Sequence, residues 1–148
     1  MNDGVPVGII LPYKRGNDGF FAQTYSDMHR ARINLSFLLQ TMKGERPMMP
    51  TYGSDLHELL FEPNMELHAD DLFEDAVIEA AMTWMPEVSI MEVSVERDNI
   101  NNPHHAIIHI KFRLNNVPDS DQEIGVSMGY MTDAIRERYR GGPRGSAD

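Results

Sequence analysis

The segment Gly44–Pro63, GERPMMPTYGSDLHELLFEP, decides how this chain folds. It follows the apolar run Leu35–Lys43, LSFLLQTMK, which is typical of the last turns of a helix. Gly44 stands where a helix-terminating glycine belongs, because glycine readily adopts the left-handed conformation in which many helices end. The segment therefore predicts a helix that stops abruptly and leads into an irregular crossover.

The second half of the segment predicts a stiff connection into a short helix. Pro47 and Pro50 restrict the backbone of the crossover. Gly53 permits a conformation that other residues resist. Ser54 is a good N-cap for a short helix over residues 55–61.

Glu45 and Arg46 are the charged residues of this crossover, which we call the signature loop (residues 44–53). The planar guanidinium of Arg46 can donate to several carbonyl groups or to a carboxylate. We interpret the arginine mainly as a brace of the loop, and direct contact with a partner is the alternative. The neighbouring Met48 and Met49 fit a core or an interface equally well.

Two long helices are predicted on either side of the signature loop. The first begins at Thr24 or Ser26 and runs through Met42, and the second begins at Asp70 or Asp71 and ends at Pro86. Each has an apolar stripe at helical spacing. The stripes are Met28, Ala31, Leu35, Leu38, Leu39 and Met42 in the first helix, and Phe73, Ala76, Val77, Ala80, Ala81 and Trp84 in the second.

Alternating residues then predict a hairpin of strands 88–96 and 106–114. Met91, Val93 and Val95 share one face of the first strand, and we expect Met91 to fill the core, as we do Met28 and Met42. The second strand buries one face, which consists of Ala106, Ile108, Ile110, Phe112 and Leu114.

A third strand is predicted over residues 123–130. Ile124, Val126 and Met128 lie on one face with Tyr130, whereas the other face holds Gly125, Ser127 and Gly129. Small residues let another backbone approach closely. We therefore expect this strand to be a sheet edge or an extended arm that binds a partner, and we expect a chain ending at Asn116 to fold without it.

The predicted fold class is α+β, with two long helices and a short one packed on a small antiparallel sheet that includes a C-terminal β-hairpin. The length of 148 residues fits one domain. We expect an N-terminal extended arm over 1–23, the α+β domain over 24–130 and a flexible C-terminal tail over 131–148.

Charge is distributed unevenly along the chain. Residues 55–98 contain 13 acidic residues and one basic residue, whereas residues 1–54 carry a net charge of +2, from 6 basic and 4 acidic residues. Binding of nucleic acid is not expected, because it requires lysine and arginine to neutralise phosphates. The acidic segment is either a solvated face or a docking face for a basic partner.

Enzymatic and metal sites are weakly indicated. Glycoside hydrolysis requires two carboxylates across the scissile bond, and Glu45, Glu58, Glu62 and Glu66 offer pairs that any acidic chain would offer. His104, His105 and His109 lie in or beside one predicted strand, where His105 and His109 are too far apart to chelate one ion, and His57 and His68 with Asp70 and Asp71 lack a metal-ligand pattern. The chain has no cysteine. No apolar run approaches the roughly 20 residues that span a bilayer. We expect no cofactor, metal, membrane or small-molecule substrate.

The order of these pieces resembles the baseplate wedge family of contractile-tailed phages and type VI secretion systems, which has also been described as lysozyme-like. The resemblance covers roughly residues 7–114. It is carried by the early Gly-Ile-Ile-Leu-Pro, the helix ending in Leu-Leu-x-Thr, Gly-Glu-Arg, the Pro-x-x-Gly-x-x-Leu of Pro50–Leu56 and the Leu-Phe-Glu-Pro of Leu60–Pro63.

This resemblance implies a non-enzymatic structural protein of the virion tail baseplate, assembled in the host cytoplasm. Its implied partners are the larger wedge proteins and the tail sheath protein, whose first ring it would help to initiate. A type VI secretion baseplate component is the closer alternative, and a glycan-cleaving enzyme is the more distant one.

One departure from the family pattern falls where the second helix meets the hairpin. Many members carry Glu-Pro-Arg there, whereas this chain has Met85, Pro86 and Glu87. The proline that stops the helix is kept, and the flanking charges are lost or reversed. We expect this corner to face another wedge protein through altered contacts.

Overall fold

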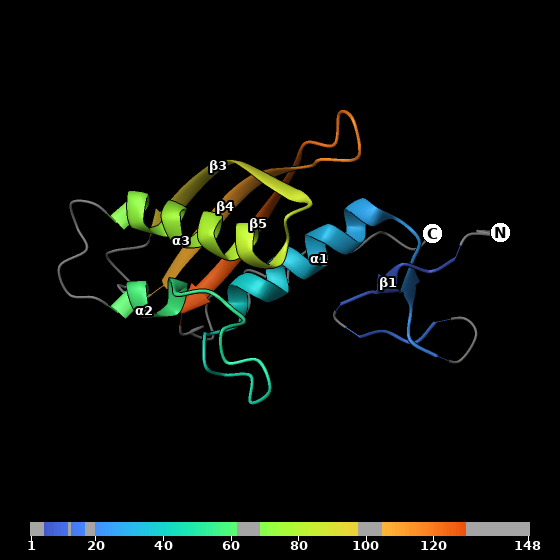
Figure 1. The fold of residues 1–148 in the computed structure, drawn as a ribbon, viewed down its shortest axis with the longest axis horizontal. Helices are drawn as coiled ribbons and strands as arrows, with labels where there is room; N and C mark the ends of the chain where they lie inside the picture. Colours follow the sequence, from blue (N-terminus) through green and yellow to red (C-terminus); the bar gives the residue numbers. More distant parts are fainter. Residues whose placement is uncertain (1–4, 12, 17–19, 62–68, 98–104, 130–148) are drawn as a thin grey trace, which may run out of the picture.

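The computed structural model describes residues 5–11, 13–16, 20–61, 69–97 and 105–129. Within these residues, three helices and two small antiparallel sheets confirm the predicted α+β class (Figure 1). The elements are β1 (Gly8–Ile9), β2 (Gln23–Thr24), α1 (Asp27–Gln40), α2 (Leu56–Phe61), α3 (Ala69–Trp84), β3 (Val88–Arg97), β4 (His105–Leu114) and β5 (Gln122–Gly129).

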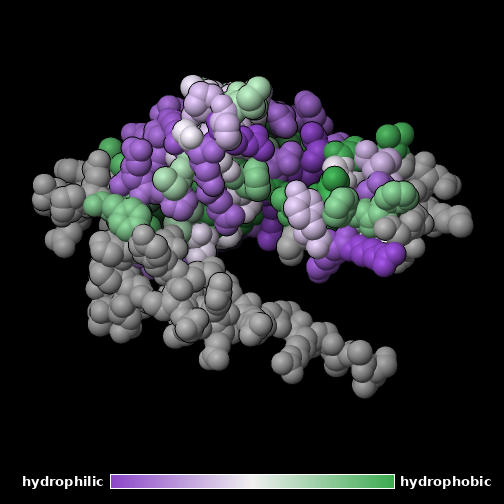
Figure 2. All heavy atoms as spheres, turned by 90° about the horizontal axis from the view of Figure 1, so that it is seen from below, coloured by the Kyte–Doolittle hydropathy of each residue, from purple (hydrophilic) through white to green (hydrophobic). Residues whose placement is uncertain are grey.

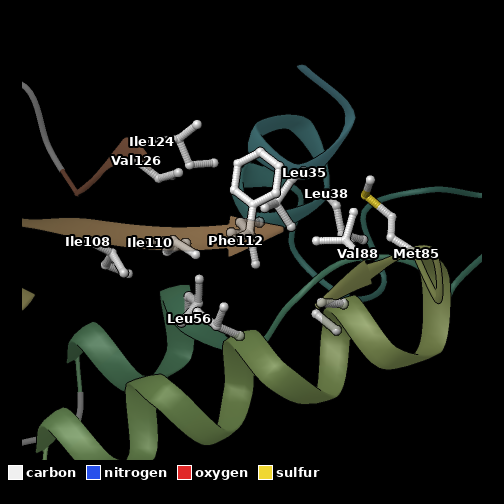
Figure 3. Close-up of a cluster of buried hydrophobic side chains, with 14 of the residues drawn as sticks. Leu35, Leu38, Leu56, Met85, Val88, Ile108, Ile110, Phe112, Ile124 and Val126 are labelled. Carbon is white, nitrogen blue, oxygen red and sulfur yellow. The ribbon is translucent and has the colours of Figure 1, made fainter. Parts of the chain in front are cut away.

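The larger sheet has the order β3-β4-β5, and both strand pairs are antiparallel. Its central strand β4 buries one face as predicted, with Ala106, Ile108, Ile110, Phe112 and Leu114 at most 3% exposed. The three helices cover this face. Figure 3 shows Phe112 beside Leu35 and Leu38 of α1, and Leu56 of α2 facing the same strand. This single layer of helices over a sheet contains the hydrophobic core.

The helices form where the apolar stripes predict them. Ser26 caps α1, since its Oγ accepts a hydrogen bond from the backbone N–H of His29 at 3.4 Å. The prediction that Met42 belongs to the buried stripe is wrong. The helix ends at Gln40, so Met42 lies beyond the periodic face and is 44% exposed. Met28 packs against the core as expected.

The predicted shared face of β3 is interrupted by a bulge. The pairing register with β4 shifts between Ile90 and Glu92, so Met91 has no partner in the ladder. An extra residue in a strand reverses the alternation. Val93 and Val95 pack against the core with Ile90, whereas Met91 is 56% exposed, and the expectation that it fills the core is wrong.

The N-terminal segment forms a narrow ribbon beside the start of α1 (Figure 1). Gly8 pairs with Thr24 and Ile9 with Gln23, and hydrogen bonds from Ile10 to Ala22 and from Ala22 to Lys14 extend the pairing. The predicted boundaries at residues 23 and 130 stay predictions, and the tail over 131–148 lies outside the described residues. Within the described part, no helix is long and apolar enough to cross a membrane.

Candidate partner-binding surfaces

The end of the signature loop is fixed to the end of α1 by close backbone contact. Gly53 has a φ of 127°, and a Cβ at this position would lie 2.5 Å from the carbonyl oxygen of Thr41. The next residue, Ser54, donates its N–H to the same oxygen at 2.9 Å and its buried Oγ to the carbonyl of Leu39 at 2.8 Å. The predicted need for glycine at position 53 therefore has a steric cause.

The start of the loop is closed by local hydrogen bonds. Gly44 has a φ of 87° and donates its N–H to the carbonyl of Pro50 at 2.7 Å. The Glu45 carboxylate accepts the N–H of Met42 at 3.1 Å, and the N–H of Glu45 donates to the carbonyl of Met42 at 3.2 Å. Glu45 is thus a local cap of the chain that leaves α1.

Arg46 contacts aromatic rings that the sequence interpretation did not consider, and its role as a brace of the loop stays a prediction. Its guanidinium lies 4.3 Å from the ring centroid of Tyr52 and 5.7 Å from that of Phe37. The Tyr52 ring in turn meets the Trp84 ring edge-on at 5.1 Å. Within the described residues the guanidinium has no carbonyl or carboxylate partner, so the predicted hydrogen bonding is wrong. Burial raises the pKa of Tyr52, and the charge of Arg46 lowers it in part.

The tip of the loop projects from the molecule between α1 and α2 (Figure 1). Pro47 and Pro50 are exposed, Met48 is 93% exposed and Met49 is 40% exposed. Both methionines therefore lie on the surface rather than in the core. The loop is a projection with an apolar tip, which is the form expected of a contact element.

Lys43, just before the loop, forms ion pairs with the residue before α2 and with α3. Its Nζ lies 2.5 Å from a carboxylate oxygen of Asp55 and 3.3 Å from one of Glu79 in α3. The hydrogen bond to Asp55 is the main cause of the raised pKa of Lys43. This bridge connects the loop to the acidic part of the chain.

The predicted contact corner divides into buried and accessible residues. The Met85 side chain is 5% exposed and belongs to the core, whereas Pro86 is exposed and Glu87 is half-buried. Asn115 holds the corner. Its backbone N–H donates to the carbonyl of Glu87 at 2.9 Å, and its Nδ2 donates to the carbonyl of Pro86 at 3.1 Å. Only Pro86 and Glu87 can offer side chains to a partner, and sequence reasoning gave no role to Asn115.

The three apolar side chains of β5 point into the core. Ile124, Val126 and Met128 are 3%, 0% and 2% exposed, and β5 packs against α1 and α2. These side chains cannot be contact residues in the folded chain. What β5 can offer a partner is its backbone, because it is an edge strand and half of the N–H and C=O groups of an edge strand face away from its neighbour.

The two edges of the larger sheet differ. The β3 edge carries the bulge at Met91 together with Glu92 and Glu96, and bulges and charges are features that protect an edge from pairing. On the outer face of β5, by contrast, Gly125 and Ser127 present almost no side chain. A Cβ at Gly125 would make ordinary contacts only, with the His109 ring at 3.7 Å and with the Ile107 Cγ2 at 3.8 Å. Exposed carboxylates lie on both outer strands, Glu123 on β5 and Glu92 and Glu96 on β3, so the edges differ in that the β5 ladder is regular and the β3 ladder is bulged.

The histidines of β4 contact this outer face rather than each other. The Nε2 of His105 lies 3.0 Å from the Oγ of Ser127, and His109 lies between Glu96 and Glu123 at 3.5 Å and 3.7 Å. Among the described residues, no group of three or more His, Cys, Asp or Glu side chains could hold a metal ion. His104 lies outside those residues.

Comparison with known proteins identifies the family of this chain. The family model described as baseplate wedge protein gp25 matches residues 29–119, from α1 through β4. This chain belongs to the baseplate wedge protein gp25 family. It is 29% identical over 91 residues to baseplate wedge protein gp25 of Enterobacteria phage T4, a match that covers 62% of this chain and 67% of the phage protein.

Solved structures of low sequence identity share the fold. A putative tail lysozyme from Geobacter sulfurreducens aligns with a TM-score of 0.63 and 19% identity, covering 74% of this chain and 96% of that one. A chain of the anti-feeding prophage baseplate gives a TM-score of 0.61 at 22% identity, covering 75% and 86% of the two chains. A chain of a type VI secretion baseplate complex gives 0.55 at 12%, covering 70% and 93%.

The family match ends before β5 begins and starts after the β1–β2 ribbon. The signature loop and the corner at Pro86 lie inside the match. The family therefore accounts for the helical layer and for two strands of the sheet, and the ribbon lies outside that matched region.

Proposed function

We propose that this gp25-family chain is a structural part of the baseplate wedge of a contractile phage tail. In this role it joins the larger wedge proteins to the first ring of tail sheath subunits and helps to initiate sheath assembly. It would be assembled in the host cytoplasm and stay in the virion tail. The family description and the phage T4 relative favour a phage tail over a type VI secretion baseplate, to which only the fold points.

The observation that carries this proposal is that β5 is an edge strand with a regular, unbulged ladder. A strand from a sheath subunit can extend the larger sheet there by main-chain hydrogen bonds. The buried side chains of Ile124, Val126 and Met128 fix the strand in place before the partner arrives. A fixed edge costs less conformational entropy on binding than a segment that must be ordered first.

The edge is tested by a charge on its outer face. Gly125→Lys places a long cation beside the edge, in a position where the backbone leaves room for a side chain. Ser94→Lys is the matched control, because Ser94 pairs with His109 and His109 pairs with Gly125, so both substitutions lie on one rung at opposite edges. We expect Gly125→Lys alone to reduce capture of the tail sheath protein and the fraction of tails with a sheath. Equal sheath capture by the two variants would contradict the proposal.

The corner is proposed as the contact with larger wedge proteins. Glu87→Lys should weaken wedge assembly in co-expression while leaving the melting temperature of the isolated chain unchanged, because the Glu87 side chain has no ion-pair partner among the described residues. Glu58→Lys on the exposed side of α2 is the control. Normal wedge assembly in the Glu87→Lys variant would exclude this contact.

A glycan-cleaving activity has less support. Glu45, one of the candidate carboxylates, caps the N–H of Met42 in a turn, and Glu62 and Glu66 lie outside the described residues. We expect the purified chain not to clear suspensions of cell walls. Clearing that is lost on Glu45→Gln would establish an enzyme instead.

A further inference from the structure

Several apolar side chains of the N-terminal ribbon, which is the described part of residues 5–26, are not covered by the rest of the described chain. Apart from the buried Thr24, its described residues are largely accessible. The exposed apolar side chains include Val5 at 84%, Tyr13 at 69%, Phe20 at 77% and Phe21 at 58%. Figure 2 shows hydrophobic atoms gathered at the right-hand end, which is the end where β1 lies in Figure 1. An accessible aromatic cluster of this kind marks a contact surface.

Contacts at the start of α1 hold the ribbon in place. Thr24 is 6% exposed, and its Oγ1 accepts the N–H of Ser26 at 3.3 Å immediately before the helix. The stem of Arg30 lies against Gly8, where an added Cβ would be 3.4 Å from the Arg30 Cγ. A two-stranded ribbon is marginally stable alone, so a partner that covers the aromatic side chains would also stabilise it.

The charge of the ribbon indicates the charge that its partner should have. Lys14 and Arg15 are exposed and have no ion-pair partner among the described residues, and the sequence of residues 5–26 has a net charge of +1, from these two basic residues and Asp18. The partner should therefore combine apolar side chains with carboxylates. The C-terminal tail of the chain is a poorer candidate, because residues 130–148 contain four arginines and three acidic residues, a net charge of +1.

One surface with this combination is the outer face of α3. Leu72 is 40% exposed and Met82 is 72% exposed. Asp71, Asp75 and Glu79 fall on the same side of the helix at helical spacing. Within the described residues Asp71 and Asp75 have no ion-pair partner. We call these five residues the α3 face.

The ribbon cannot reach the acidic end of the α3 face of its own chain. The first turns of α3 lie at the left of Figure 1 and the ribbon lies at the right. We propose that the N-terminal ribbon docks on the α3 face of a second copy of this chain. Because the two surfaces are different patches, the contact is head-to-tail, and repeated contacts close a ring or extend a filament.

The absence of cysteine from the chain allows a direct crosslinking test. Full-length Phe20→Cys and Met82→Cys proteins are mixed and oxidised, and the disulfide-linked heterodimer is quantified on a non-reducing gel. Phe20→Cys mixed with Val117→Cys is the control, since Val117 is 37% exposed in the turn after β4. We expect the first pair to give at least about tenfold more heterodimer, because docking raises the effective concentration of the two thiols. Equal yields would overturn the proposal.

Reversing the charges of the two surfaces tests whether electrostatic docking brings the two cysteines together. Lys14→Glu with Arg15→Glu in the Phe20→Cys chain should reduce the heterodimer to the control level, because the ribbon then repels the α3 face. Adding Asp71→Lys with Asp75→Lys to the Met82→Cys chain should restore the yield. All these positions are exposed, and circular dichroism of each variant verifies folding. A heterodimer yield that does not change with these charge reversals would refute contact between copies. Crosslinking of Phe20→Cys only to a different protein in assembled baseplates would refute it as well.

Discussion

At the scale of single residues, Gly53 is the position of the signature loop that tolerates least change. Its φ of 127° and the 2.5 Å separation between an added Cβ and the Thr41 oxygen both oppose a side chain. We expect Gly53→Ala to lower the free energy of unfolding by about 2–4 kcal/mol, because the clash adds to the backbone strain. Urea unfolding measures the difference.

Gly44→Ala is the matched control for this prediction. Gly44 also has a positive φ, of 87°, but nothing lies within 4 Å of an added Cβ. The cost at Gly44 should therefore be only about 1 kcal/mol, from backbone strain alone. Similar losses of unfolding free energy in the two variants would show that the close approach of Gly53 to Thr41 does not contribute to the cost of Gly53→Ala.

Arg46 is predicted to stabilise the fold modestly. An exposed cation–π contact contributes about 0.5–1 kcal/mol, so Arg46→Ala should cost that much more than Arg32→Ala on the exposed side of α1. A double-mutant cycle with Tyr52→Leu tests the cause. If the effects of Arg46→Ala and Tyr52→Leu add without coupling, the arginine does not brace the loop through that ring.

At the scale of elements, β5 is part of the domain and not an appendage. The sequence-based expectation that a chain ending at Asn116 folds is incompatible with the burial of Ile124, Val126 and Met128. Burying each such side chain contributes about 1.5–3 kcal/mol, against a total stability of about 5–15 kcal/mol for a domain. We predict that this truncated chain lacks cooperative thermal unfolding, whereas a sharp transition by circular dichroism would contradict the assignment of β5 to the core.

The connection from β4 to β5 has an ion pair whose effect depends on pH. Arg113 Nε lies 2.6 Å from a carboxylate oxygen of Asp121, and this hydrogen bond holds the pKa of Asp121 below its ordinary value of 3.8. A depressed pKa stabilises the fold above the unfolded value and loses that contribution as the pH falls through the folded value. The melting temperature of Asp121→Asn should therefore lie below that of the unmodified chain at pH 7, and the gap should narrow at pH 3. A gap that is independent of pH would exclude this linkage.

Strong periodic patterns predicted the elements, and contacts between distant residues could not be predicted. The stripe of α3 and the alternation of β4 each have one dominant period, and both elements form where that period indicates. The β3 bulge left no signal, because Met91 suits either face of a strand. The Arg46–Tyr52 contact was missed because the ring lies across a loop whose path the sequence does not define.

At the scale of the whole molecule, one layer of helices covers one face of the sheet and leaves two unequal edges (Figure 1). The sequence indicated that residues 123–130 form an edge, since small residues alternate there with apolar ones. It could not show that the apolar side chains face the core, because only the packing of α1 and α2 on β5 determines this. We therefore propose that the backbone of β5, and not its apolar side chains, contacts the sheath subunit.

Amide hydrogen exchange shows directly whether tail sheath binds at the β5 edge. In the isolated chain, the amides of Gln122–Gly129 that face away from β4 should exchange rapidly, and those bonded to β4 should exchange slowly. On addition of the tail sheath protein, the outward amides of β5 should become protected while those of the bulged β3 edge stay unchanged. Binding of sheath that leaves the exchange of the β5 amides unaltered, or that protects the β3 edge instead, would exclude strand addition at β5.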